Sequence, residues 1–186
     1  MNKPLFLFVG PSGSGKTTIA NVMEKKYDYK QIQSYTTRKP RYEGETGHIF
    51  ITEEDFNNLG ELAAYTLYNS HRYGTTIDQI NNSDIYVIDV QGIKTLLNNY
   101  KCDRMIYIFY FDTSVYTRIN RMLERGDHDG KIISRLLEDE KYDWYKKIQE
   151  IVLDADYNTY RYVRICKIDA NESLSDVINQ ILWFLK

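Results

Sequence analysis

The sequence is poor in several features that mark specialised classes of protein. It holds only two cysteines, Cys102 and Cys166, which lie far apart and have no metal-binding or redox motif around them. We therefore expect two buried thiols in a reducing compartment. No repeat, low-complexity tract or obvious linker interrupts the chain. This favours one domain over residues 1–186.

Strong charge and long apolar runs are missing as well. The net charge is -2 at pH 7, whereas proteins that bind nucleic-acid polymers are usually basic. The longest apolar runs, LFLFV and MIYIFYF, have the length of strands and fall far short of the roughly 18 residues that span a bilayer. The N-terminal apolar stretch is too short for a secretory signal. We expect a cytoplasmic protein with no nucleic-acid, membrane or obligate protein partner.

What the sequence does contain is an alternation of strand and helix patterns. Apolar runs predict strands over 4–9, 84–90, 104–111 and 162–169. Helical spacing of apolar residues predicts helices over 16–26, 92–100, 114–126, 131–152 and 173–186. The helix over 131–152 would place these residues on its apolar side: Ile133, Leu136, Leu137, Ile148 and Ile151. The alternation predicts an α/β fold with a mostly parallel sheet flanked by helices. Residues 31–75 break it and predict a small inserted α/β subdomain with one brief helix.

The segment GPSGSGKTT, residues 10–18, matches the phosphate-binding pattern G-x-x-x-x-G-K-[ST] between a strand and a helix. Its glycines let backbone N–H groups turn toward phosphate oxygens, and the helix adds the positive end of its dipole. Lys16 would reach the β- and γ-phosphates of a nucleoside triphosphate, and the Thr17 hydroxyl would ligate Mg²⁺. The predicted donor residues are Gly10, Ser12, Gly13, Ser14, Gly15, Lys16, Thr17 and Thr18. A dinucleotide-binding loop fits less well, because Thr18 stands where the third glycine belongs.

A second basic cluster follows in SYTTRKPRYEGETGHIF. Arg38, Lys39 and Arg41 fall within four positions, and guanidinium groups bind phosphate through directional, bidentate hydrogen bonds. A second anion site beside a triphosphate loop is what a kinase for a phosphorylated acceptor requires. The alternative interpretation is a solvated basic turn.

The sequence resembles the guanylate kinase family of nucleoside monophosphate kinases in GPSGSGKTT, SYTTRKPR, RYGTT, IDVQG and the arginine spacing of RMLERG. The resemblance implies a P-loop kinase core over 1–33, 82–125 and 150–186, an acceptor-binding subdomain over 34–81 and a lid over about 125–149. It also implies the reaction ATP + GMP → ADP + GDP, with ATP as the phosphate donor and Mg²⁺ as the metal.

The resemblance further implies roles for single residues. The acceptor residues would be Ser34, Arg38, Arg41, His48, Tyr73, Thr75 and Asp89. Arg38 would also act in catalysis with Lys16, Arg121, Arg125 and Arg135, by stabilising charge on the transferring phosphoryl group. Asn171 would lie near the donor adenine. Two alternatives stay open: Asp89 could orient Mg²⁺ through water instead of meeting the base, and the arginines of RMLERG could form a solvated helix face.

Three positions depart from the family pattern. Ala64 stands where the family has the glutamate that pairs with guanine, and the only nearby acid is Glu61. Val87 replaces one of two acids that precede the IDVQG glycine, and His48 replaces a phosphate-binding tyrosine. These changes leave two alternatives: a kinase for another phosphorylated acceptor such as ribose 1,5-bisphosphate, and a non-catalytic binding module. The intact phosphate loop argues against the binding module.

Overall fold

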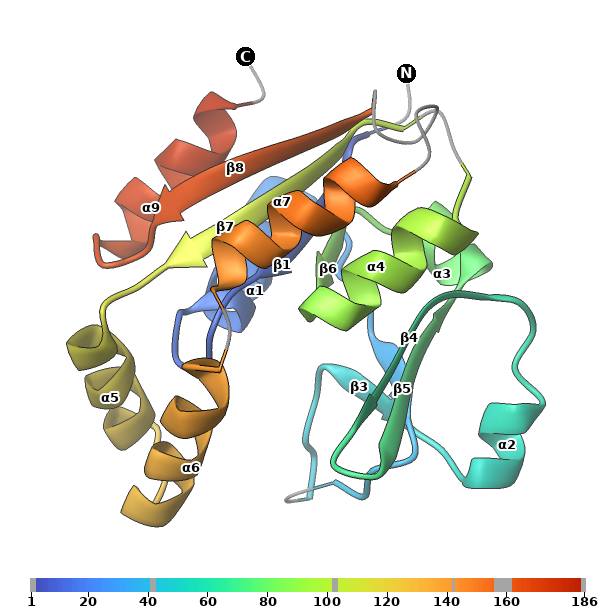
Figure 1. Cartoon of the computed structure of the whole chain (residues 1–186), viewed down its shortest axis with the longest axis horizontal. Coiled ribbons are helices and arrows are strands. Elements are labelled where there is room, and N and C mark those ends of the chain that lie inside the picture. Colours follow the sequence, from blue (N-terminus) through green and yellow to red (C-terminus); the bar gives the residue numbers. More distant parts are fainter. Residues whose placement is uncertain (1–2, 41–42, 102–103, 142, 156–161, 185–186) are drawn as a thin grey trace.

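The computed structural model contains two separate β-sheets with helices around them (Figure 1). The residues it describes are 3–40, 43–101, 104–141, 143–155 and 162–184. Arg41 and Cys102 lie outside these ranges, whereas Cys166 is buried, as predicted. Over the described ranges, no helix has the length and apolar character needed to cross a membrane.

The core sheet has four strands in the order β6-β1-β7-β8, and every neighbouring pair is parallel. The strands are β1 (Leu5–Val9), β6 (Ile85–Val87), β7 (Ile106–Asp112) and β8 (Val163–Asp169). All five residues of β1 are buried, because it lies between two strands and is covered on both faces. The predicted parallel sheet is therefore confirmed.

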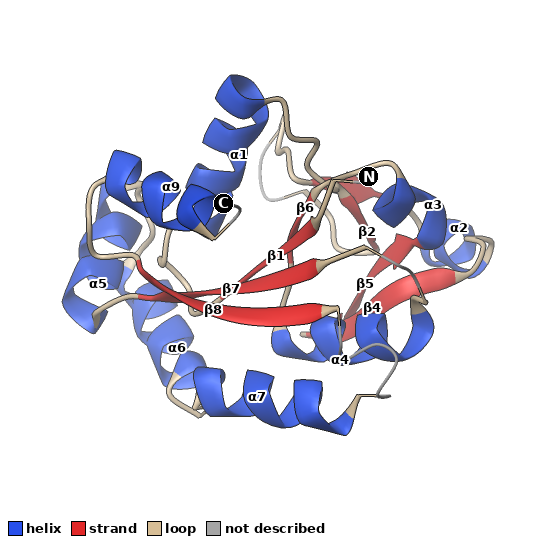
Figure 2. Ribbon diagram, turned by 90° about the horizontal axis from the view of Figure 1, so that it is seen from above, coloured by secondary structure: helices blue, strands red, loops and turns tan. Residues whose placement is uncertain are grey.

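Helices cover both faces of this sheet, as the view from above shows (Figure 2). The helices on one face are α4 (Val90–Asn99) and α7 (Trp144–Asp154), and those on the other are α1 (Lys16–Tyr27) and α9 (Leu174–Trp183). Successive side chains of a strand point to opposite faces. Accordingly, Leu5, Leu7 and Val9 pack with α4 and α7, while Phe6 and Phe8 pack with α1 and α9.

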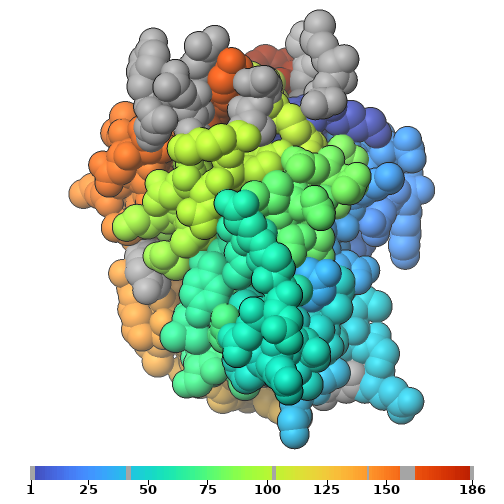
Figure 3. All heavy atoms as spheres, turned by 90° about the vertical axis from the view of Figure 1, so that its right-hand side faces the viewer, coloured from blue at the N-terminus to red at the C-terminus, as the bar shows by residue number. Residues whose placement is uncertain are grey.

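The second sheet occupies the segment that breaks the strand–helix alternation. Its strands, in the order β3-β2-β5-β4, are β2 (Ser34–Thr36), β3 (His48–Phe50), β4 (Leu62–Tyr68) and β5 (His71–Thr76). Two short helices flank it, α2 (Glu53–Asn57) and α3 (Ile77–Asn81). Asn69 and Ser70 join β4 to β5 with φ values of 48° and 61°, as a tight hairpin turn requires. This subdomain forms the lower part of the face in Figure 3.

The expectation of one long helix over 131–152 is wrong. The segment forms two helices, α6 (Asp129–Asp139) and α7, and the Asp143 side chain caps the start of the second by accepting from Lys146 N. Ile133 and Leu137 are 56% and 60% exposed. These two residues therefore do not belong to one buried apolar face that continues from α6 into α7. Helix α5 (Val115–Glu124) precedes α6 and reaches it through a tight corner.

Candidate active site

The phosphate loop, residues 10–15, connects the end of β1 to the start of α1. Gly13 and Gly15 have φ values of +78° and +93°, which favour glycine. A Cβ atom on Gly13 would lie 2.7 Å from the backbone oxygen of Arg118, and one on Gly10 would lie 2.9 Å from that of Phe111. The glycines are thus required both by the turn and by the close approach of α5 and β7.

Helix α1 begins without a side-chain cap. Gly15 occupies its N-cap position and provides no side-chain hydrogen bond, whereas α4, α5 and α9 are capped by Asp89, Ser114 and Ser173. The first N–H groups of a helix need an outside acceptor, and an anion supplies one favourably. The end of the phosphate loop therefore fits a phosphate group.

The Lys16 ammonium lies within the loop. Its Nζ donates to the backbone oxygens of Gly10 and Pro11 at 2.7 and 2.8 Å and to Ser14 Oγ at 3.1 Å. Burial lowers the pKa of Lys16 to about 8; the carboxylate of Asp139 opposes this shift, and three nearby guanidinium groups add to it. A charged donor that is already desolvated and fixed is well placed to meet a phosphate.

A cavity of about 810 Å³ opens in front of the loop, between α4, the end of β4, α6 and α7. The predicted donor residues all line it, together with Asp89, Arg125 and Arg135: Gly10, Ser12, Gly13, Ser14, Gly15, Lys16, Thr17 and Thr18. A second cavity of about 500 Å³ adjoins the same loop and is lined by Thr18, Arg121, Arg125, Ala170 and Val177, among others. The structure thus places the phosphate loop and the predicted catalytic residues Arg121, Arg125 and Arg135 around two adjoining cavities.

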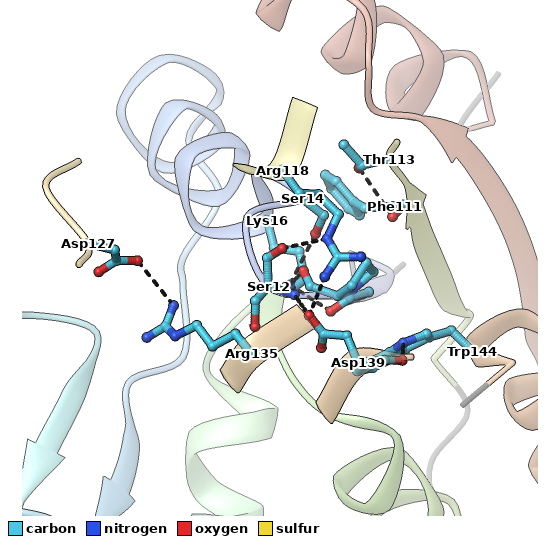
Figure 4. Close-up of polar contacts among 12 residues, drawn as sticks. Ser12, Ser14, Lys16, Phe111, Thr113, Arg118, Asp127, Arg135, Asp139 and Trp144 are labelled. Atoms are coloured by element: carbon cyan, nitrogen blue, oxygen red, sulfur yellow. Dashed lines mark hydrogen bonds and ion pairs between the residues drawn. The ribbon is translucent and has the colours of Figure 1, made fainter. Parts of the chain in front are cut away.

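A buried ion pair that the sequence did not reveal contacts the loop at Ser12 (Figure 4). Arg118 Nε donates to the Ser12 oxygen at 2.8 Å, Ser12 N donates to Asp139 Oδ2 at 2.9 Å, and Arg118 is paired with Asp139. The two side chains are only 6% and 8% exposed. Arg118 lies three residues before Arg121, and Asp139 lies four after Arg135, so helical spacing could have indicated that they share faces with the predicted arginines.

The three arginines predicted to stabilise the transferring phosphoryl group make two different kinds of contact. Arg121 bonds to the donor loop and to the end of β8, through Ser14 O at 3.3 Å and Ala170 O at 2.8 Å. Arg125 and Arg135 both pair with Asp127. The two arginines of RMLERG therefore both have protein partners and both line a cavity.

Four predicted acceptor residues come together on the second sheet. Ser34 Oγ and His48 Nδ1 share a hydrogen bond of 2.9 Å, and the His48 ring stands edge-on to Tyr73 at 5.5 Å. Arg38 donates to both carboxylate oxygens of Glu45 at 2.9 and 3.0 Å, and its hydrogen bonds to Glu45 and to Tyr73 raise the pKa of Arg38. This cluster is separate from the residues that line the 810 Å³ cavity.

Thr75 is turned toward the core. Its Oγ1 donates to the phenol oxygen of Tyr86 at 2.7 Å, and both residues are buried. Burial raises the pKa of Tyr86, and the hydrogen bond from Thr75 opposes this shift. Ala64 lies opposite Thr75 in the β4–β5 register and is 1% exposed. The Tyr86 hydroxyl, which the sequence did not single out, thus lies beside the position of the missing glutamate.

Asp89 caps α4 and faces the main cavity. It accepts from Gly92 N at 2.6 Å and from Thr66 Oγ1 at 3.0 Å, and burial raises its pKa. Asn171 accepts from Ser114 N at 2.9 Å and lines neither of the two cavities described above. The structure therefore brings Asp89 to the donor loop, while the Asn171 side chain holds the start of α5.

The protein oxygens near the loop fit a magnesium ion held jointly with phosphates. Among the described residues, no group of three or more His, Cys, Asp or Glu side chains is arranged to hold a metal. The exposed Thr17 hydroxyl and the Asp89 carboxylate face the same cavity. Mg²⁺ is usually bound by one or two protein oxygens plus substrate phosphates and water, and this donor set meets that description.

Sequence comparison decides the family. The guanylate kinase family model matches residues 1–141. The chain belongs to the guanylate kinase family. Guanylate kinase of Thermotoga maritima is 31% identical over 100% of this chain and 87% of its own length, and that of Caldanaerobacter subterraneus subsp. tengcongensis is 30% identical over 91% and 92%. Guanylate kinase of Helicobacter pylori strain HPAG1 is 28% identical over 91% and 97%.

A solved structure agrees on the fold. Guanylate kinase from Anaplasma phagocytophilum superposes with a TM-score of 0.52 at 17% identity, covering 98% of this chain and 84% of the other. Membership of the guanylate kinase family and this likeness confirm the predicted P-loop kinase fold and the prediction of an ATP-dependent phosphotransferase.

Proposed function

We propose that this chain transfers the γ-phosphoryl group of ATP to GMP, giving ADP and GDP. One observation carries the proposal: Lys16, Arg125 and Arg135 line a single cavity that extends to Asp89 and to the end of β4 in the second sheet. The relatives named above are guanylate kinases, and the alignments with this chain cover most of their length. This similarity favours GMP over other acceptors.

On the donor side, the phosphate loop binds the triphosphate of ATP through its backbone N–H groups and the uncapped start of α1. Lys16 exchanges its bonds to Gly10 and Pro11 for phosphate oxygens. Arg121, Arg125 and Arg135 then neutralise charge that develops on the transferring group. Positioning and charge neutralisation are the main requirements of phosphoryl transfer, and none of these residues needs to form a covalent bond.

On the acceptor side, we assign the phosphate of GMP to Arg38, His48 and Tyr73, with Arg41 as a further ligand. Arg38 exchanges its contact with Glu45 for the acceptor phosphate. Ser34 and Thr75 are assigned to the base side of the acceptor site, whereas Asp89, which lines the cavity of the phosphate loop, is assigned to Mg²⁺. Because the Thr75 hydroxyl donates to Tyr86 in this structure, we assign that phenol to the same site.

Thr17 and Asp89 would hold Mg²⁺, the first through its hydroxyl and the second through water. The ion would reduce the negative charge of the phosphates during transfer. We also propose that the chain is divided as the resemblance implies, into a core over 1–33, 82–125 and 150–186, an acceptor subdomain over 34–81 and a lid over about 125–149. Asn171 is still assigned to the adenine side, because its neighbours Ala170 and Glu172 line the second cavity.

The test is ADP release from ATP and Mg²⁺ with a panel of acceptors: GMP, dGMP, AMP, UMP, CMP and ribose 1,5-bisphosphate. GMP should give the highest kcat/KM. Lys16→Met should reduce turnover by orders of magnitude, whereas Lys25→Met, at the exposed end of the same helix, serves as its matched control. Arg38→Met should raise the KM for the acceptor far more than that for ATP, with the exposed neighbour Lys39→Met as control. Highest activity with another acceptor would refute the GMP assignment.

A further inference from the structure

Asp127 occupies the corner between α5 and α6, where its backbone is held firmly. Gly126, with φ of +81°, ends α5 and donates to Leu123 O at 2.8 Å, and Asp127 N donates to Met122 O at 3.0 Å. This pair of bonds is the usual end of a helix that terminates in a left-handed glycine. The Asp127 side chain is only 9% exposed, although corners normally face water.

Three cations surround the Asp127 carboxylate. Arg125 donates to Oδ2 through Nε at 2.7 Å and through Nη2, and Lys131 Nζ donates to Oδ1 at 2.8 Å. Arg135 Nη1 lies 3.6 Å from Oδ2, and Figure 4 shows this contact. Burial alone would raise the pKa of Asp127, but hydrogen bonds from Lys131 and Arg125 outweigh burial and lower the pKa to about 2. The carboxylate is therefore ionised at neutral pH.

Two of these cations face the main cavity while they are bound to Asp127. Arg125 and Arg135 line it, and the positive charge of each contributes to lowering the pKa of Lys16. Two guanidinium groups that converge on one space repel each other, and each long side chain loses rotamer freedom when it is fixed. A single anion between them offsets the repulsion and restricts both side chains.

We infer that Asp127 is a positioning residue, which holds Arg125 and Arg135 at the donor cavity before substrate arrives. This inference rests on the proposed function. Donors that are fixed in advance need no reorganisation when charge develops. Asp127 would act only through the two arginines and would make no contact with the substrates itself.

Two other roles for Asp127 predict different results for its variants. A corner that merely joins α5 to α6 would change stability and leave the kinetics of the folded protein intact. A carboxylate that keeps the arginines away from phosphate would lower activity, so that its removal would raise kcat. The geometry favours positioning, because Arg125 and Arg135 line the cavity in the paired state.

The experiment compares Asp127→Asn with wild-type protein in steady-state ADP release from ATP and GMP. We expect kcat to fall about 10- to 100-fold, as when a group that orients a functional ligand is lost, with little change in the KM for GMP. Asp127→Glu should recover part of the loss. Lys131→Met removes the third cation, which does not line the cavity, and should leave kcat near the wild-type value; Asp129→Asn, exposed in the first turn of α6, is a further control.

Thermal unfolding of each variant is measured at the assay pH, and kcat is expressed per folded protein. An unchanged or higher kcat for Asp127→Asn overturns the inference, as does a loss that follows the unfolded fraction. Slow ATP hydrolysis without acceptor is compared in the same proteins. If GMP adds nothing to wild-type ADP release, the acceptor assignment fails, while the effect of Asp127→Asn on this hydrolysis still decides its role.

Discussion

Removing Asp139 should destabilise the fold strongly, because it leaves a buried cation without its partner. The Arg118 side chain is only 6% exposed in the wild-type structure. In Asp139→Ala this cation loses its counter-charge, and Ser12 N–H loses its acceptor. Breaking a buried ion pair from one side costs about 3–5 kcal/mol, out of a typical total free energy of unfolding of about 5–15 kcal/mol. In a chain of this size, about 2–4 °C in Tm accompanies each kcal/mol, so Tm should fall by roughly 6–20 °C.

The double variant Arg118→Leu/Asp139→Ala separates charge from packing. Replacing both members of a buried pair by apolar residues is often neutral or stabilising, so most of the lost Tm should return. Lys141→Met breaks an exposed ion pair with Glu138, which lies near the end of α6, the helix that carries Asp139. It is the matched control, and it should change the free energy of unfolding by less than about 1 kcal/mol.

The assay is thermal unfolding followed by circular dichroism, with urea titration to obtain the free energy of unfolding. Both are run without nucleotide, so that binding does not mask the loss. If Asp139→Ala melts within about 2 °C of wild type, the shift that less than 1 kcal/mol produces, the ion pair contributes little and the reasoning is wrong. A double variant as unstable as the single one would place the loss in the Ser12 contacts rather than in the unpaired charge.

Three further predictions concern single groups at the site. Lys16 has a pKa of about 8 and is assigned to bind phosphate as the cation, so kcat/KM for ATP should fall as pH rises through 8. The variant Lys16→Arg stays protonated and should lack this fall. An identical pH profile for the two proteins would contradict the prediction. Tyr86→Phe removes the partner of the buried Thr75 hydroxyl and should lower the free energy of unfolding by about 1–3 kcal/mol, measured in urea; an unchanged midpoint would count against this bond. Ala64→Glu should raise the ratio of kcat/KM for GMP over AMP, and a constant ratio in a folded variant would show that another group reads the base.

The sequence was sufficient for features encoded by neighbouring residues. Glycines, a lysine and a hydroxyl at fixed spacing predicted a loop between a strand and a helix, and the structure places it there with its predicted residues lining the main cavity. The binding role of each residue stays a prediction. The parallel core strands were also predicted, because strands buried on both faces appear as continuous apolar runs.

What the sequence did not reveal depends on pairing between distant segments. Asp139 reaches Ser12 across 127 positions, and Arg118 lies 21 positions from Asp139; no local pattern marks either side chain as buried. The break between α6 and α7 was missed because apolar residues continue at helical spacing on both sides of it. Thr75 was assigned from the resemblance alone, and only the fold shows that a tyrosine from β6 meets its hydroxyl.

The indole of Trp144 gives this protein a built-in optical reporter. Its Nε1 donates to the backbone oxygen of Asp139 at 3.0 Å, and its ring lines the main cavity. The other tryptophan, Trp183, is 67% exposed at the end of α9, so a soluble quencher should remove its emission first. The fluorescence that remains would follow the end of α6, and hence the arrival of nucleotide at the loop, without any attached dye.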